Sequence, residues 1–293
     1  MKGDLGAATG EGIGRGIRIL ARAGYAAKGL VYGCTGGLSA MAAFGAGSRN
    51  ARGSREALAS VGQGTSGFVL LVLVAAGMAG YVVWQLVQVF RDPEGRGSDA
   101  KGLIVRSALF ISACVYAALD LWILEVLLSG SGGRGAGQGS GGDAKTWSAV
   151  LLAQPYGTWL LGLFGSGVVV LGFAEWVRAY RASFQSQLRH DLSGHARSVL
   201  RKVARVGLAS RGVVFLIIGG FLVNAAATSD PSQAQDLEGA LTTLARQRYG
   251  PWLMGALALG LVAYGVFQVA KARYRRIGPL AEGDGARSGP EEA

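Results

Sequence analysis

Long apolar runs alternate with short polar segments along most of this chain. Six of these runs contain few or no charged residues: 29–48, 57–90, 107–128, 146–174, 212–229 and 249–270. Each reaches the roughly 20 residues that an α-helix needs to cross about 30 Å of hydrocarbon. The pattern predicts six membrane-spanning helices, at 24–46, 67–90, 104–128, 157–179, 206–228 and 251–273.

The same motif of glycines, cations and aromatic residues returns along the chain. Residues 21–37, ARAGYAAKGLVYGCTGG, recur at 204–220 as ARVGLASRGVVFLIIGG, 183 residues later. A divergent copy lies between them, where Arg106 repeats Arg22 at an offset of 84. Tandem copies of one such two-helix unit bury their apolar faces against neighbouring copies. We therefore expect an all-α integral membrane protein with six transmembrane helices, arranged as three tandem helical hairpins with approximate threefold pseudo-symmetry.

The repeats and the segments between them define the expected organisation of the chain. In each outer loop we expect a short amphipathic segment, as at 233–248, where leucines at spacings of four and three share one helical face. Ser129–Gly142 is nearly all Gly and Ser, which is typical of a flexible linker. The expected segments are a cytoplasmic N-terminal segment at 1–20, repeat 1 at 21–90, the divergent repeat 2 at 104–179, a basic cytoplasmic linker at 180–203, repeat 3 at 204–273 and a disordered tail at 277–293.

The formal net charge of +11 is distributed unevenly between alternate loops. The N-terminal segment, the 91–106 and 178–211 loops and the C-terminal segment together hold 22 basic residues, and the other three loops hold 7. Cytoplasmic loops of membrane proteins carry such an excess of Lys and Arg. We expect both termini in the cytoplasm and contact with anionic lipid headgroups of the plasma (inner) membrane. No nucleic-acid partner is expected, because no aromatic residues are interleaved with the basic clusters.

The repeated helix start resembles a known family. The motif Ala-Arg-x-Gly-x-x-x-(Lys/Arg)-Gly-(Val/Leu)-Val-(Tyr/Phe), at Ala21–Tyr32 and Ala204–Phe215, resembles that of bacterial membrane proteins catalogued as domain of unknown function 1206. The central copy departs from the motif, with Ser and Ala where the glycines and the cation belong. The resemblance implies three two-helix units in a membrane and no known reaction.

Glycines dominate the first helices of repeats 1 and 3. Small residues let helix backbones approach closely in a bilayer, so we expect these glycines to pack helices together. A path lined by glycine is the alternative. The residues are Gly29, Gly33, Gly37, Gly212, Gly219 and Gly220.

Cations recur where the first helix of each repeat leaves the cytoplasm. Arg22, Arg106 and Arg205 hold this position, and Lys28 and Arg211 lie about 9 Å deeper at about 1.5 Å per residue. An Arg or Lys at a positively polarised helix N-terminus favours an anion or a lipid headgroup. Snorkelling side chains that only set the topology are the alternative.

Two acids fall inside the third predicted span. Asp120 replaces Gly36 at the repeat offset, and a carboxylate within a bilayer is costly and marks a functional candidate. Glu125 lies nearer the outer surface and also belongs to this candidate polar site. A structural role for Asp120, hydrogen-bonded to a neighbouring helix, is the alternative.

No residue set for catalysis, metal binding or cofactor binding is expected. His190 and His195 lie five apart in a basic loop without further ligands, and Cys34 and Cys114 fall within spans. The sequence predicts a non-enzymatic membrane protein that binds lipid or a partner protein within the membrane. The alternative is a small permeation unit for a proton, an ion or a small solute through the centre of the three hairpins. A polar cavity on the axis that reaches Asp120 would favour permeation, and a packed axis would favour binding.

Overall fold

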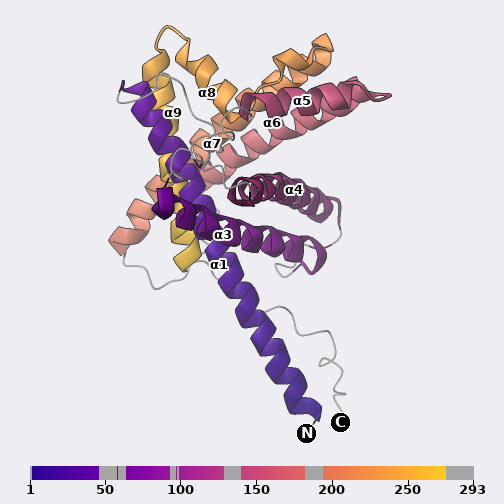
Figure 1. Cartoon of the computed structure of the whole chain (residues 1–293), viewed down its shortest axis with the longest axis vertical. Helices are drawn as coiled ribbons and strands as arrows, with labels where there is room; N and C mark the ends of the chain where they lie inside the picture. The colour runs from indigo at the N-terminus through magenta and orange to yellow at the C-terminus, as the bar shows by residue number, and fades with distance from the viewer. Residues whose placement is uncertain are drawn as a thin grey trace.

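The computed structural model describes residues 2–45, 58, 64–92, 97, 99–128, 140–181 and 194–274, and the regular structure of these residues is entirely helical. Figure 1 shows the helices in chain order: α1 (Lys2–Ala43), α3 (Gly64–Phe90), α4 (Ala100–Leu128), α5 (Ser140–Leu152), α6 (Gly157–Arg181), α7 (Gly194–Thr228), the 3-10 turn η3 (Pro231–Gln233), α8 (Leu237–Ala245) and α9 (Gly250–Tyr274).

The described helices are those of a multi-pass membrane protein. Five of them are long and apolar enough to cross a membrane, namely α3, α4, α6, α7 and α9. The sixth predicted span, 24–46, is helical as far as Ala43 as part of α1, but α1 is not among these five. Its apolar stretch carries Lys28 and several glycines, which lower its hydropathy, and it packs between α3 and α9 instead of standing free.

Helix boundaries differ from the predicted segments at two places. α1 begins at Lys2 and continues without a break from the predicted N-terminal segment, 1–20, into the first predicted span. α7 begins at Gly194, inside the predicted linker. The rest of that linker (182–193), most of the Gly/Ser loop (129–139) and the predicted tail lie outside the described residues.

Repeats 2 and 3 build the same short helix and turn before their second long helix. The predicted amphipathic segment of repeat 3 forms α8, where Leu241 is fully buried. After α5 and α8 the chain turns through equivalent hydrogen bonds, in which the Gly157 amide donates to the Gln154 carbonyl at 2.9 Å and the Gly250 amide to the Gln247 carbonyl at 2.8 Å. A Cβ at either glycine would collide with a carbonyl oxygen of the preceding turn.

The long helices pack in a continuous series, α4, α3, α1, α9, α7, α6. Figure 1 shows α9 crossing beside α1, and α6 lying along α7. Each second helix therefore packs on the first helix of another repeat: α3 on α4, α6 on α7 and α9 on α1. These contacts would close a ring of six helices if α4 and α6, the two helices of repeat 2, also packed together.

The glycines within hairpins 1 and 3 make equivalent contacts. A Cβ on Gly24 of α1 would meet Tyr81 of α3, and a Cβ on Gly207 of α7 would meet Tyr264 of α9 in the same way. Likewise Gly77 abuts Ala27, and its counterpart Gly260 abuts Ser210. The repeat in the sequence is thus a repeat in packing.

Repeat 2 lacks this internal packing. Ala108 and Ile111 occupy the positions of Gly24 and Ala27, so a close approach of the second helix is blocked. A Cβ on Gly167, the counterpart of Gly77, would have no heavy atom of a neighbouring helix within 4 Å. The predicted closed threefold arrangement is therefore not observed between α4 and α6.

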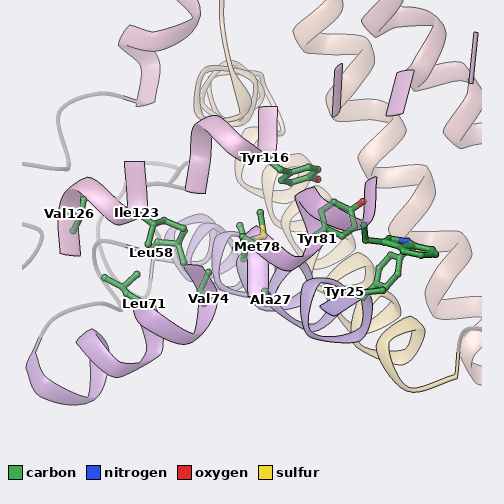
Figure 2. Close-up of a cluster of buried hydrophobic side chains, with 13 residues drawn as sticks. Tyr25, Ala27, Leu58, Leu71, Val74, Met78, Tyr81, Tyr116, Ile123 and Val126 are labelled. Carbon is green, nitrogen blue, oxygen red and sulfur yellow. The ribbon is translucent and has the colours of Figure 1, made fainter. Parts of the chain in front are cut away.

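The main apolar core joins α1, α3 and α4. Leu71, Val74 and Met78 of α3 pack with Ile123 of α4, and Leu58 closes this end of the cluster. Figure 2 shows that the other end of the cluster is aromatic, with Tyr25, Tyr81 and Tyr116 gathered where the three helices meet. The apolar core is thus continuous with the group of tyrosines between α1, α3 and α4.

Candidate functional site

Lys28 lies in the interior of the protein, surrounded by aromatic rings. Its side chain projects from α1 between α3 and α4 and is 3% exposed. The ammonium donates to the hydroxyl of Tyr81 at 2.9 Å, and it lies 4.7 Å from the centroid of the Tyr81 ring and 4.4 Å from that of Tyr116. Such cation–π contacts stabilise a desolvated charge by about 2 kcal/mol.

Arg211 occupies the position of Lys28 in repeat 3. Its guanidinium carbon lies 4.4 Å from the ring centroid of Phe215 and 5.0 Å from that of Tyr264. Within the described residues Arg211, unlike Lys28, has a carboxylate partner: its Nη1 contacts Oε1 of Glu175 on α6 at 2.5 Å. The sequence places these two cations at one repeat position, and the structure places both in the same centre.

A layer of tyrosines fills the space between the two cations. The hydroxyls of Tyr32 and Tyr116 lie 3.3 Å apart, and the ring of Tyr32 meets that of Tyr264 edge to face at 4.8 Å. The rings of Tyr81 and Tyr116 meet in the same way at 5.2 Å. Sequence reasoning missed this layer, although Tyr32 and Tyr116, and likewise Tyr81 and Tyr264, recur at the repeat offsets. The middle of the molecule is packed with rings at this level.

One position of the second helices places a polar side chain beside this layer in every repeat. Gln85, Glu175 and Gln268 are all buried there. Glu175 also contacts Arg178, three residues later on α6, at 3.3 Å. The Arg178 side chain is 56% exposed, and its contact is longer than that of Arg211. Among the described residues, no hydrogen bond reaches Gln85 Oε1, Glu175 Oε2 or Gln268 Oε1.

The acids of the predicted polar site lie elsewhere. Asp120 is half-buried on α4, one turn beyond Tyr116, and no cation of the described chain forms an ion pair with it. Its Oδ1 is buried without a hydrogen-bond partner. Glu125 is exposed. The structure therefore does not join these acids to the central cations.

The outer cations have separate environments. Arg22 is exposed on α1, and Arg106 donates from Nε to the carbonyl of Val89 at 2.7 Å. Arg205 lines an open groove of about 620 Å³ between α6 and α7, together with Trp176, Tyr180 and two alanines, Ala179 and Ala209. The Trp176 indole donates to the carbonyl of Ala209 at 3.0 Å, which fixes one wall of the groove.

Within the described part of the chain, no three His, Cys, Asp or Glu side chains are grouped to hold a metal ion. His195 is exposed, and His190 lies outside the described residues. Cys34 and Cys114 are free thiols. Among the described residues, cations are found in two settings: Lys28 and Arg211 lie within the aromatic centre, and Arg205 lies in the open groove.

Comparison with known proteins gives three matched stretches. The model of a family described as Domain of Unknown Function (DUF1206) matches residues 23–92, 108–182 and 206–275. The chain belongs to this family. It is also 35% identical over 263 residues to an uncharacterised protein of Bacillus subtilis, YxxB, covering 89% of this chain and 92% of that protein. No solved structure matches.

The DUF1206 stretches meet through glycines of the first helices. A Cβ on Gly29 would lie 2.7 Å from the carbonyl oxygen of Gly265 on α9. A Cβ on Gly212 would lie 2.9 Å from the carbonyl oxygen of Gly172 on α6. Gly219 is packed against α6 in the same manner. At the other glycines predicted to pack helices, a Cβ would have nothing within 4 Å: Gly33, Gly37 and Gly220.

Proposed function

We propose that this membrane protein is non-enzymatic and binds an anionic lipid whose headgroup occupies the groove between α6 and α7. The observation that carries the proposal is the position of Arg205, an exposed cation in a groove walled by Trp176 and Tyr180. Trp and Tyr concentrate at the level of lipid headgroups in membrane proteins, and guanidinium binds phosphate with paired hydrogen bonds.

The surface beside the groove suits the acyl chains of the same lipid. On α6, the side chains of Leu163, Val170 and Phe173 are 74%, 64% and 52% exposed. Such exposed apolar side chains in a membrane protein face hydrocarbon. A lipid whose phosphate meets Arg205 would therefore lay its chains along an apolar helix surface.

Replacing Arg205 with glutamine should weaken retention of anionic phospholipid by roughly tenfold or more, because a hydrogen bond to a charged group contributes about 1.5–3 kcal/mol. Native mass spectrometry of the gently solubilised full chain would measure this retention. Arg201→Gln removes an exposed cation one turn earlier on α7, and it should leave lipid retention unchanged. Equal retention by parent and Arg205→Gln would refute the groove as the headgroup site.

We propose a topology in which α1 provides a sixth span and both termini face the cytoplasm of a bacterial cell, with the repeats related by pseudo-threefold rotation. The excess of basic residues in alternate loops supports it. Reporter fusions at Asp143 and Pro231 should report the outer side of the plasma (inner) membrane. A cytoplasmic signal at either position would contradict this topology.

Binding is favoured over permeation by the packed tyrosines. A central path for an ion or solute would have to pass the contact between Tyr32 and Tyr116, whose hydroxyls lie 3.3 Å apart. Asp120, the acid that a proton path would use, lies one turn from Tyr116 without a charged partner in the described chain.

A further inference from the structure

Two of the interfaces between repeats are copies of one another. At the α6·α7 interface Gly172 meets Gly212. At the α9·α1 interface Gly265 meets Gly29 in the same way. The same offsets relate both pairs, since α9 residues follow their α6 counterparts by 93 and α7 residues follow their α1 counterparts by 183. The groove of Arg205 lies on the first interface, so the second interface has an equivalent surface.

The contacts between α1 and α9 show which residues lie at the same level. Gly29 meets Gly265. Gly36, seven residues later on α1, meets Ala258, seven residues earlier on α9, so the two helices run in opposite directions. Seven residues the other way from Gly29 is Arg22, and seven residues the other way from Gly265 is the last turn of α9. Arg22 therefore lies beside that turn.

The last turn of α9 brings a second arginine to this level. Arg273 is exposed there, as Arg22 is on α1. Lys271, the other cation of the turn, lies instead over the rings of Tyr25 and Phe267, 4.9 Å and 5.4 Å from their centroids. Neither arginine forms an ion pair or a hydrogen bond with the part of the chain that the structure describes. The α9·α1 interface thus presents two exposed guanidinium groups, one from each helix.

The α6·α7 interface has a single arginine at the equivalent level. Arg205 is the counterpart of Arg22, but the counterpart of Arg273 is Tyr180, which lines the groove. A guanidinium binds a phosphate group through paired hydrogen bonds. One guanidinium matches the single charge of a phosphodiester, and two match a phosphomonoester, whose charge at pH 7 is about −1.5 to −2. The exchange of tyrosine for arginine therefore changes which headgroup is matched in charge.

The surface of α9 next to Arg273 suits acyl chains. Leu259, Val266 and Val269 are exposed. They precede Arg273 by 14, 7 and 4 residues, which places these side chains on one face of the helix. Because α9 is long and apolar enough to cross a membrane, this face is suited to contact hydrocarbon. We refer to Arg22, Arg273 and this apolar face together as the Arg22 surface.

We propose that the Arg22 surface binds phosphatidic acid, with the phosphomonoester between Arg22 and Arg273 and the acyl chains along α9. The headgroup offsets the repulsion between two like charges at one level, and it accepts hydrogen bonds from both helices. The argument from equivalence rests on the function proposed for the groove of Arg205, although the two sites share no residue.

The test measures which lipid the full chain retains after gentle solubilisation, by native mass spectrometry. Phosphatidic acid and phosphatidylglycerol with identical acyl chains are compared at equal concentration. Arg205→Gln serves as the background, because it removes the cation of the groove and leaves the Arg22 surface intact. This variant should retain phosphatidic acid roughly tenfold better than phosphatidylglycerol, the effect of one additional hydrogen bond to a charged group.

Further changes in the Arg205→Gln background test the two arginines. Arg273→Tyr gives the Arg22 surface the residue type that the groove has, and it should abolish the preference for phosphatidic acid. Arg22→Gln should abolish it as well. Arg201→Gln, which removes an exposed cation of α7, should leave the preference unchanged. All of these side chains are exposed, so the variants should fold, and thermal unfolding in detergent would verify this.

The proposal is overturned if the Arg205→Gln background retains both lipids equally, or if Arg273→Tyr keeps the preference for phosphatidic acid. The two sites can fail separately. Equal retention of phosphatidylglycerol by the parent and Arg205→Gln, with a preference for phosphatidic acid that Arg273→Tyr abolishes, would refute the groove and support the Arg22 surface. Loss of phosphatidylglycerol in Arg205→Gln without any preference for phosphatidic acid would support the groove and overturn the Arg22 surface.

Discussion

Replacing Glu175 with glutamine should destabilise the protein by about 3–5 kcal/mol, because removal of one partner leaves a buried ion uncompensated. The affected ion is Arg211, whose side chain is 13% exposed and whose Nη1 contacts Glu175 at 2.5 Å. Chemical unfolding of the detergent-solubilised protein would measure the loss.

Two further variants test the cause of that loss. Arg178→Gln removes the exposed partner of Glu175 and should change stability by less than about 1 kcal/mol, as for a surface ion pair. The double change Glu175→Gln with Arg211→Ser removes both charges and should recover most of the stability. It leaves the residue types that the α3·α4 interface has at the equivalent repeat positions, Gln85 and Ser112. If the double variant is as unstable as Glu175→Gln, the unpaired charge is not the cause.

The second large effect is expected at adjacent glycines of α1. A Cβ on Gly36 would lie 2.6 Å from the carbonyl oxygen of Ala258 and 2.8 Å from the amide of Val262, and backbone atoms of α9 cannot move aside. Gly36→Leu should therefore cost about 3 kcal/mol, the upper end of the usual cost of overpacking, and lower the yield of folded protein. Size-exclusion chromatography and thermal unfolding in detergent would measure both.

Gly37→Leu is the matched control, because a Cβ at Gly37 would have nothing within 4 Å. It should fold as the parent does. The pair Gly219 and Gly220 repeats the comparison on α7, with Gly219→Leu damaging and Gly220→Leu tolerated. Equal tolerance of Gly36→Leu and Gly37→Leu would contradict the packing of α1 against α9.

The sequence is informative about helices and repeats because apolar run length and residue spacing are local properties. It is less informative about which side of a glycine-rich helix faces a neighbouring helix. In the Gly36-Gly37 and Gly219-Gly220 pairs either residue could face a neighbour, and only packing distinguishes them. The small-residue prediction at Gly29, Gly212 and Gly219 therefore coincides with close contacts, whereas that at Gly37 and Gly220 does not.

The sequence identifies only some residues of the candidate site, for a similar reason. Lys28 and Arg211 can be recognised from their repeat position, but their different partners depend on how repeats meet in space. The spacing along α6 favours a pair of Glu175 with Arg178, but the shorter contact of Glu175 is with Arg211 on α7. An acid within a span is a functional candidate from sequence, which selects Asp120. Asp120 nevertheless lies outside the central cluster, because α4 packs on α3 and not on α6.

The packing of α9 on α1 means that the first and last described long helices are neighbours. They meet through the same glycines and at the same positions as α6 and α7, which are consecutive long helices of the chain. The contact between α9 and α1 therefore does not differ in kind from a contact between consecutive helices of the chain. Each repeat is joined to the next in a cyclic order, and the chain could be cut between other repeats without removing any of these contacts.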